Sequence, residues 1–99
     1  MSYEMIRQAI IDRESLTATY DRCIRLFSPH VWGKDRAGAR VVLAFQYGGG
    51  RRGGLPMAGD WICFGVDGLA GLARNGDTWI VGSLVPRSLH LVTEIDVGA

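Results

Sequence analysis

Hydrophobic residues near the start of the chain recur at helical spacing. They stand one, three and four residues apart, at Met5, Ile6, Ala9 and Ile10, which is the pattern of one apolar face of an α-helix. Ser2 belongs to the residue types that cap a helix N-terminus, and Glu4 stands near the positive end of the helix dipole. We therefore expect a short N-terminal helix that packs one face against the rest of the fold.

From residue 16 onward the pattern changes to alternation, which is typical of β-strands. Residues 16–20 alternate apolar side chains with threonines, and residues 23–28 form a second alternating run. Asp21 and Arg22 between the two runs predict a tight turn. Together the runs and the turn predict a β-hairpin.

The second alternating run has two distinct faces. Ile24 and Leu26 share one face, which we assign to the core, so that Arg25 is expected to point away from it. Pro29 follows, and proline lacks the N–H that a strand ladder needs. We therefore expect the strand to end before Pro29.

The rest of the chain divides into further strands and connections. Residues 40–47 are apolar at both parities, which favours a strand buried on both faces. Before this strand we expect a turn-rich connection at 33–38, and after it a long mobile loop with six glycines at 48–60. The chain then continues with a strand at 61–66, a one- or two-turn helical connection at 67–73, a turn at Asn75-Gly76 and a terminal strand within 89–97. The terminal strand either closes a barrel or lies along its edge.

This order of elements predicts a mainly β (α+β) fold. About five short antiparallel strands behind one helix are typical of a small, partly open β-barrel, with a β-sandwich fragment as the competing architecture. Ninety-nine residues without an internal shift in composition indicate one domain over 1–99.

Composition narrows the classes of function. A formal net charge of +1 is too small for the broad basic surface that drives non-specific nucleic-acid binding. Cys23 and Cys63 are too far apart for a Cys-x-x-Cys motif. No cleavable leader and no apolar run of the ~18 residues that a membrane helix needs are visible. We expect a cytoplasmic, soluble protein without membrane contact, cofactor or metal.

Several short motifs, taken in order, resemble the WYL domain family. They are Ala9-Ile10-Ile11-Asp12-Arg13, Leu16 to Tyr20, Arg25 four residues before Pro29, a glycine followed by an apolar strand, and the segment Cys63-Phe64-Gly65-Val66-Asp67-Gly68-Leu69. The resemblance is strongest over 4–72 and leaves 73–99 as a C-terminal extension with a terminal strand. It implies an Sm-like, SH3-type β-barrel that acts as a regulatory sensor of a small anionic ligand or a nucleic-acid end.

The chain departs from the family pattern at two places. The name-giving Trp-Tyr-Leu falls on Val41-Val42-Leu43, which keeps an apolar strand but lacks both aromatic rings. The family's Asp-Arg pair falls on Asp67-Gly68, so one family arginine is missing. The chain also has no room for a helix-turn-helix, which implies a stand-alone version of the family.

Six residues are candidates for ligand binding: Tyr20, Arg25, Ser28, His30, Arg51 and Arg52. Arg25 matches the family arginine and either contacts an anion or pairs with a neighbouring carboxylate. His30, which follows Ser28 at the expected strand end, either contacts a ligand or bonds to the turn. Tyr20 either stacks on a base or fills the core.

The paired arginines lie among glycines. Glycine-exposed amides beside two guanidinium groups can wrap a phosphate, although the segment matches neither the Walker pattern nor the dinucleotide fingerprint. The alternative is a surface loop without a ligand. Trp61 and Trp79 are expected to pack in the core, whereas Trp32 is expected to be exposed for binding.

Catalytic patterns are weak. Glu94 and Asp96 share a strand face with His90 and either recruit a metal or protect an exposed edge. The edge is the simpler explanation, so we expect no enzyme. Two functional hypotheses follow: a regulatory module that binds an anionic small molecule or nucleic-acid end, or an interaction module that forms homo-oligomers or docks onto a larger nucleic-acid or defence-related assembly.

Overall fold

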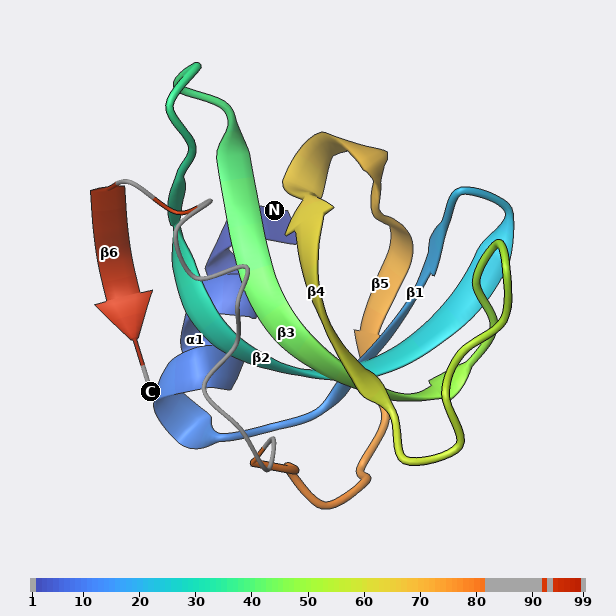
Figure 1. Cartoon of the computed structure of the whole chain (residues 1–99). Coiled ribbons are helices and arrows are strands. Elements are labelled where there is room, and N and C mark those ends of the chain that lie inside the picture. Colours follow the sequence, from blue (N-terminus) through green and yellow to red (C-terminus); the bar gives the residue numbers. More distant parts are fainter. Residues whose placement is uncertain (1, 82–91, 93, 99) are drawn as a thin grey trace.

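A computed structural model describes residues 2–81, 92 and 94–98 of the chain. Its elements, in order, are α1 (Ser2–Asp12), β1 (Leu16–Tyr20), β2 (Cys23–Lys34), β3 (Arg40–Gly49), β4 (Asp60–Gly65), the 3₁₀ turn η1 (Val66–Gly68), β5 (Ala70–Arg74) and β6 (Glu94–Gly98) (Figure 1). All described strand pairs are antiparallel. The expected mainly β fold, a small and partly open barrel headed by a helix, is confirmed, with one strand more than the five expected.

The sheet runs in the order β4-β3-β2-β1-β5, and its ends are not joined into a closed barrel. The long strand β2 pairs with β3 on one side. On its other side its first half pairs with β1, while its last four residues pair with β6. The predicted hairpin of β1 and β2 is confirmed, and both turn residues, Asp21 and Arg22, have the positive φ that a type I′ turn requires.

The helix α1 lies behind the sheet and covers β2 (Figure 1). Its expected apolar face is confirmed, because Ile6, Ala9 and Ile10 are completely or almost completely buried against a core that includes Phe27 and Phe64. Burial of each large apolar side chain contributes about 1.5–3 kcal/mol. The helix begins at Ser2, but the predicted capping by the Ser2 side chain lies outside what the structure describes.

Strand β3 is buried on both faces, as its pattern predicts. All residues from Val41 to Gln46 are buried. Val42 and Ala44 join the core beneath α1, whereas Val41 and Leu43 form a second cluster with Val92 on the opposite face. The expected loop starts slightly later than predicted, because β3 continues to Gly49.

Pro29 does not end its strand, and this prediction is wrong. β2 continues through Pro29 to Lys34. The Pro29 carbonyl accepts a hydrogen bond from the Trp79 indole, on the side of β2 where β1 has ended and β6 has not begun. Since the N and O of a strand residue point the same way, the missing N–H faces this gap and costs no ladder hydrogen bond.

The predicted helical connection at 67–73 is also wrong. Only η1 is helical, and the chain then forms β5, which pairs with β1. The local sequence has too many small residues to define a strand by its pattern, so the hydrogen bonds to β1 decide its conformation. The terminal strand β6 lies beside the end of β2, while residues 89–91 and 93 of that prediction are outside the described residues. Neither described helix is long and apolar enough to span a membrane.

Candidate ligand-binding site

Arg25 is buried, contrary to the orientation expected for it. Only 3% of its surface is exposed, whereas its neighbour Ile24 is 60% exposed. The parity of the strand was predicted correctly, but the opposite face forms the core, because Phe27 on the Arg25 side packs beneath α1. Strand alternation defines two faces but does not by itself say which one is buried.

The Arg25 guanidinium is bound by neutral groups of the chain. Its Nε and Nη2 atoms donate to the Tyr20 carbonyl at 3.2 and 3.1 Å, and Nη1 donates to Gln46 Oε1 at 3.2 Å. The guanidinium also lies 5.4 Å from the centre of the Tyr20 ring. Gln46 in turn donates to the carbonyls of Gly48 and Gly50. Arg25 therefore ties the β1–β2 turn to the end of β3.

Tyr20 fills space at the open side of the barrel. Its ring packs edge-on against Phe64 with centroids 4.9 Å apart, and its hydroxyl accepts the Gly65 N–H. A Cβ atom on Gly68 would lie 2.8 Å from the Tyr20 ring. The position that carries the second arginine in the family pattern is therefore sterically closed here, because Tyr20 occupies the space.

Ser28 and His30 hold a distant segment against β2. Ser28 is completely buried, its hydroxyl lies 2.8 Å from that of Ser15, and it accepts the Ile80 N–H at 2.9 Å. Ser15 also donates to the Thr78 carbonyl. These contacts fill the gap beside Pro29, where no described strand pairs with that side of β2.

The His30 ring lies between two indoles. It stacks on Trp79 at 4.2 Å and meets Trp61 edge-on at 4.7 Å. Its Nδ1 atom lies 2.7 Å from the Ser28 carbonyl and must donate to it. Within the described residues the buried Nε2 atom has no partner. Burial lowers the pKa of His30. The hydrogen bond to the Ser28 carbonyl opposes this shift in part, and the charge of Arg13 adds a smaller lowering of the pKa.

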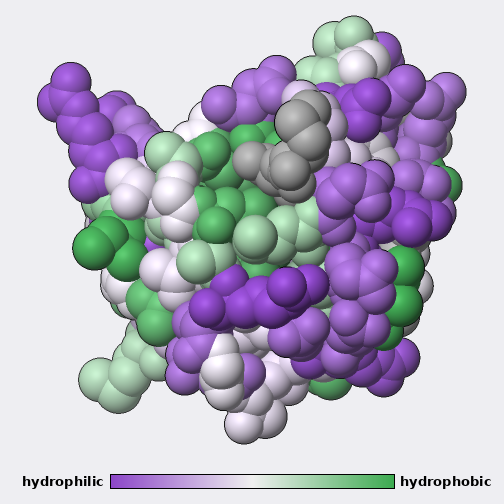
Figure 2. Space-filling model, turned by 180° about the vertical axis from the view of Figure 1, so that it is seen from behind, coloured by the Kyte–Doolittle hydropathy of each residue, from purple (hydrophilic) through white to green (hydrophobic). Residues whose placement is uncertain are grey.

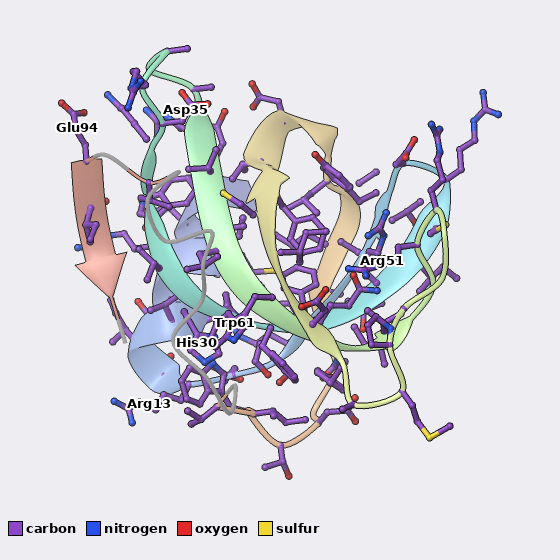
Figure 3. All side chains as sticks on the ribbon, in the orientation of Figure 1. Arg13, His30, Asp35, Arg51, Trp61 and Glu94 are labelled. Carbon is purple, nitrogen blue, oxygen red and sulfur yellow. The ribbon has the colours of Figure 1, made fainter. Side chains whose placement is uncertain are left out.

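Arg51 and Arg52 both pair with residues of the chain. Arg51 donates to the Gly54 carbonyl and to Asp60 at 3.0 Å, whereas the exposed Arg52 lies 3.5 Å from Asp21. Arg51 lies beside the start of β4, because Asp60 is the first residue of that strand, and Figure 3 shows it to one side of His30 and Trp61.

The structure thus separates the six predicted residues into two groups. Tyr20, Arg25, Arg51 and Arg52 lie around the β1–β2 turn, because Asp21 in that turn pairs with Arg52 and the Tyr20 carbonyl accepts from Arg25. Ser28 and His30 lie further along β2, and the five residue-to-residue steps from Arg25 to His30 correspond to roughly 16 Å of strand. The six residues therefore do not converge on one site.

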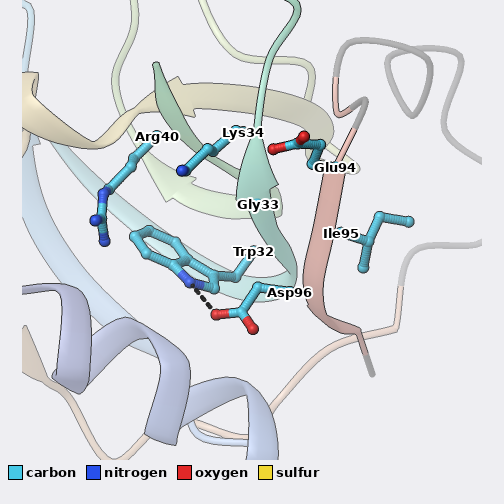
Figure 4. Close-up of a pocket in the computed structure, with 7 residues that line it drawn as sticks. All are labelled: Trp32, Gly33, Lys34, Arg40, Glu94, Ile95 and Asp96. Atoms are coloured by element: carbon cyan, nitrogen blue, oxygen red, sulfur yellow. Dashed lines mark hydrogen bonds between the residues drawn. The ribbon is translucent and has the colours of Figure 1, made fainter. Parts of the chain in front are cut away.

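A pocket of about 410 Å³ lies elsewhere, beside the far end of β2. Its lining residues come from β2, β3 and β6 and are Trp32, Gly33, Lys34, Arg40, Glu94, Ile95 and Asp96 (Figure 4). Trp32 is 4% exposed, so its predicted exposure is wrong. Sequence reasoning missed Arg40 and Lys34 because only strand pairing brings them together.

Strand register explains how the charges of the pocket are arranged. Lys34 on β2 is directly opposite Arg40 on β3 and, on its other side, opposite Glu94 on β6. Directly paired residues project from the same face of a sheet. A row of two cations and one anion therefore crosses three strands at the mouth of the pocket.

The guanidinium of Arg40 lies over an aromatic ring. Its guanidinium carbon is 4.5 Å from the centre of the Tyr3 ring and 6.0 Å from that of Trp32. The Tyr3 hydroxyl donates to Asp67 at 2.7 Å, and this hydrogen bond raises the pKa of Tyr3. A guanidinium that lies over a ring can still offer N–H donors to an anion.

Asp96 has a structural role at the pocket floor. It accepts the Trp32 indole N–H at 2.9 Å and lies 3.7 Å from Arg7 of α1. These contacts hold β6 against β2 and α1. Glu94, by contrast, is exposed and forms no ion pair within the described residues. His90, which was considered with these two acids, lies outside the described residues.

The two cysteines, Cys23 and Cys63, are free and half-buried. Burial raises the pKa of the Cys63 thiol, and the charge of Asp35 raises it further. A raised pKa keeps the thiol protonated and poorly nucleophilic. No cluster of three potential metal ligands occurs among residues 2–81, 92 and 94–98.

Comparison with known proteins gives no relative for this chain. No family model, curated protein or solved structure matches it. The resemblance to the WYL domain therefore stays a prediction that rests on the sequence motifs, and the pocket has to be interpreted from its own chemistry.

Proposed function

We propose that this chain is a non-enzymatic module that binds a small anionic ligand in the Trp32–Arg40 pocket, defined by the seven lining residues given above. The observation that carries the proposal is the set of contacts that Arg40 makes. Arg40 lines the pocket, its guanidinium lies over the Tyr3 ring, and it forms no ion pair with a carboxylate in the described part of the chain.

The charge of the other lining residues supports the same class of ligand. Asp96 is already engaged by Trp32 and Arg7, and Glu94 lies on the far side of Lys34 from Arg40. Among the described residues, no carboxylate therefore forms an ion pair with Arg40. A carboxylate or terminal phosphate of a ligand would form one and could take two parallel N–H donors from the guanidinium fork.

This site replaces the one expected around Arg25. The arginine of the family motif is buried and bonded to Tyr20 and Gln46, so an anion could reach it only by displacing those groups. Arg40 needs no such rearrangement. A regulatory role, as the family resemblance implies, would then act through ligand binding at the β2–β3–β6 end of the sheet.

The proposal is tested by titrating the ¹⁵N-labelled protein with glutarate and with inorganic phosphate and following its NMR spectrum. The indole N–H signal of Trp32 and the side-chain Nε–H signal of Arg40 report on the pocket directly. Arg40→Gln should weaken binding by about tenfold or more, since a hydrogen bond to a charged group contributes about 1.5–3 kcal/mol.

Arg36→Gln is the matched control. Arg36 is exposed in the turn that follows β2 and does not line the pocket, so its substitution removes the same charge without removing the site. Equal affinity of the Arg36 and Arg40 variants would mean that the anions respond only to net charge. That result, or the absence of binding by the unmodified protein, would reject the proposal.

A second candidate function, association through a sheet edge, has its own supporting observation. β4 pairs with β3 alone among the described strands, and residues 61–65 contain none of the charges or prolines that protect such edges. Figure 2 also shows apolar surface near the middle of the back face, bordered by hydrophilic residues. Light scattering over a wide concentration range tests this candidate, and a monomer throughout would reject self-association.

A further inference from the structure

Glu94 places a negative charge on the wall of the pocket opposite Arg40. A ligand with an anionic group alone would make no favourable contact with it. Glu94 projects from β6 towards the pocket, whereas its neighbour Ile95 points away from it (Figure 4). Arg40 and Glu94 lie on the two strands that flank β2, one on each side of Lys34. The pocket is therefore dipolar, with a cationic wall on β3 and an anionic wall on β6.

We infer that the ligand is an amino-carboxylate, a molecule whose carboxylate binds Arg40 and whose ammonium group binds Glu94. This inference rests on the proposed function, because it assigns the anionic group to the same arginine. It adds the second contact and thereby the chemical class of the ligand.

Arg40 and Glu94 differ from Asp96 because Asp96 is already bonded to other residues of the chain. Asp96 already accepts the Trp32 indole N–H and lies close to Arg7. Neither Arg40 nor Glu94 has an ion-pair partner in the described chain. An exposed acid and an exposed base that share a pocket without contacting each other are free to bind the two ends of one molecule.

The span between the walls sets the length of the ligand. Two neighbouring strand spacings separate the backbones of β3 and β6, which is roughly 10 Å. Figure 4 shows the Arg40 side chain extending away from Glu94, with Lys34 drawn between them. A molecule that reaches both therefore needs several methylene groups between its carboxylate and its ammonium group. A pocket of about 410 Å³ has room for such a molecule, and the carboxylate and ammonium of an α-amino acid would be too close together to reach both walls.

The experiment compares 5-aminopentanoate with pentanoate, which lacks the ammonium group. NMR titration should show that the unmodified protein binds 5-aminopentanoate more tightly by about tenfold or more, the gain of one charge-assisted hydrogen bond. Glu94→Gln should abolish this preference and leave pentanoate binding unchanged or stronger. Glu4→Gln, which removes an exposed acid of α1 that does not line the pocket, should keep the preference.

The outcomes separate this inference from the proposed function. If Arg40→Gln weakens both ligands but the unmodified protein binds them equally, the anion site stands and the amino-carboxylate is rejected. A preference that survives in Glu94→Gln rejects the role of Glu94 in the same way. If neither ligand binds the unmodified protein and phosphate and glutarate also fail, the proposed function is rejected together with this inference.

Discussion

The imidazole of His30 lies stacked on the indole of Trp79, with ring centroids 4.2 Å apart and planes inclined by 29°. The two residues are far apart in sequence, and their contact fixes residues 78–80 against the middle of β2. The same imidazole meets Trp61 on β4. One titratable ring therefore joins three separate parts of the chain.

The stability of the protein should depend on the protonation of His30. Its pKa is lowered in the folded state because burial disfavours the charged ring. Folding therefore favours the neutral ring. The resulting contribution to stability is fully present above the unfolded pKa of about 6.5, and it is lost as the pH falls below that value towards the folded pKa. Urea denaturation at pH 7.5 and 5 should show a lower free energy of unfolding at the acidic pH.

A histidine variant separates this effect from other groups that titrate in the same range. His30→Phe keeps an aromatic ring between the indoles and should remove much of the pH dependence between these values. His90→Gln, which changes the only other histidine of the chain, should retain it. A pH dependence that persists unchanged in His30→Phe would show that other groups are responsible.

Arg25 should contribute to stability rather than to ligand binding. Arg25→Met would leave the Tyr20 carbonyl and Gln46 Oε1 without these donors in a buried setting, at a cost of about 1–3 kcal/mol for an unsatisfied group. Chemical denaturation should report this loss, while anion affinity measured under folding conditions stays the same. Arg36→Met serves as the exposed control, and equal stability of the two variants would contradict the structural role of Arg25.

Gly68 should be intolerant of any side chain. Because a Cβ atom there would lie 2.8 Å from the Tyr20 ring, Gly68→Ala should lower the free energy of unfolding by about 1–3 kcal/mol, the range typical of overpacking. Gly65→Ala is the matched control, since its Cβ would stand at an ordinary contact distance of 3.6 Å from the Tyr20 hydroxyl. Combining Gly68→Ala with Tyr20→Leu should recover part of the loss, and additive effects would argue against this clash.

Gly33 should be required for the pocket itself. A Cβ atom at this position would collide with the backbone carbonyl of Glu94, so Gly33→Ala should push β6 away from β2 and break the Trp32–Asp96 hydrogen bond. We expect the Trp32 indole N–H signal to shift strongly and anion-induced shifts at Arg40 to diminish. Gly48→Ala, whose Cβ would make only ordinary contacts with Leu26, should leave both signals in place.

Local patterns were sufficient for several elements of the fold. The apolar spacing of α1, the turn residues between β1 and β2, and the unbroken apolar run of β3 each specify their structure through short-range preferences. β5 was missed because its small residues have weak preferences of their own. The continuation of β2 through Pro29 was missed because the sequence does not show that the proline nitrogen faces a gap between strands.

The candidate site shows even more clearly which features follow from the local sequence and which depend on tertiary structure. The sequence by itself determined a mainly β chain with a leading helix, since periodicity and turn chemistry act between residues close along the chain. Which face of β2 is buried, and therefore that Arg25 lies inside, was decided by the packing of Phe27 beneath α1. The approach of Arg40, Lys34 and Glu94 was decided by strand register, because hydrogen bonding between distant segments places their side chains in one row, and no local pattern records that pairing.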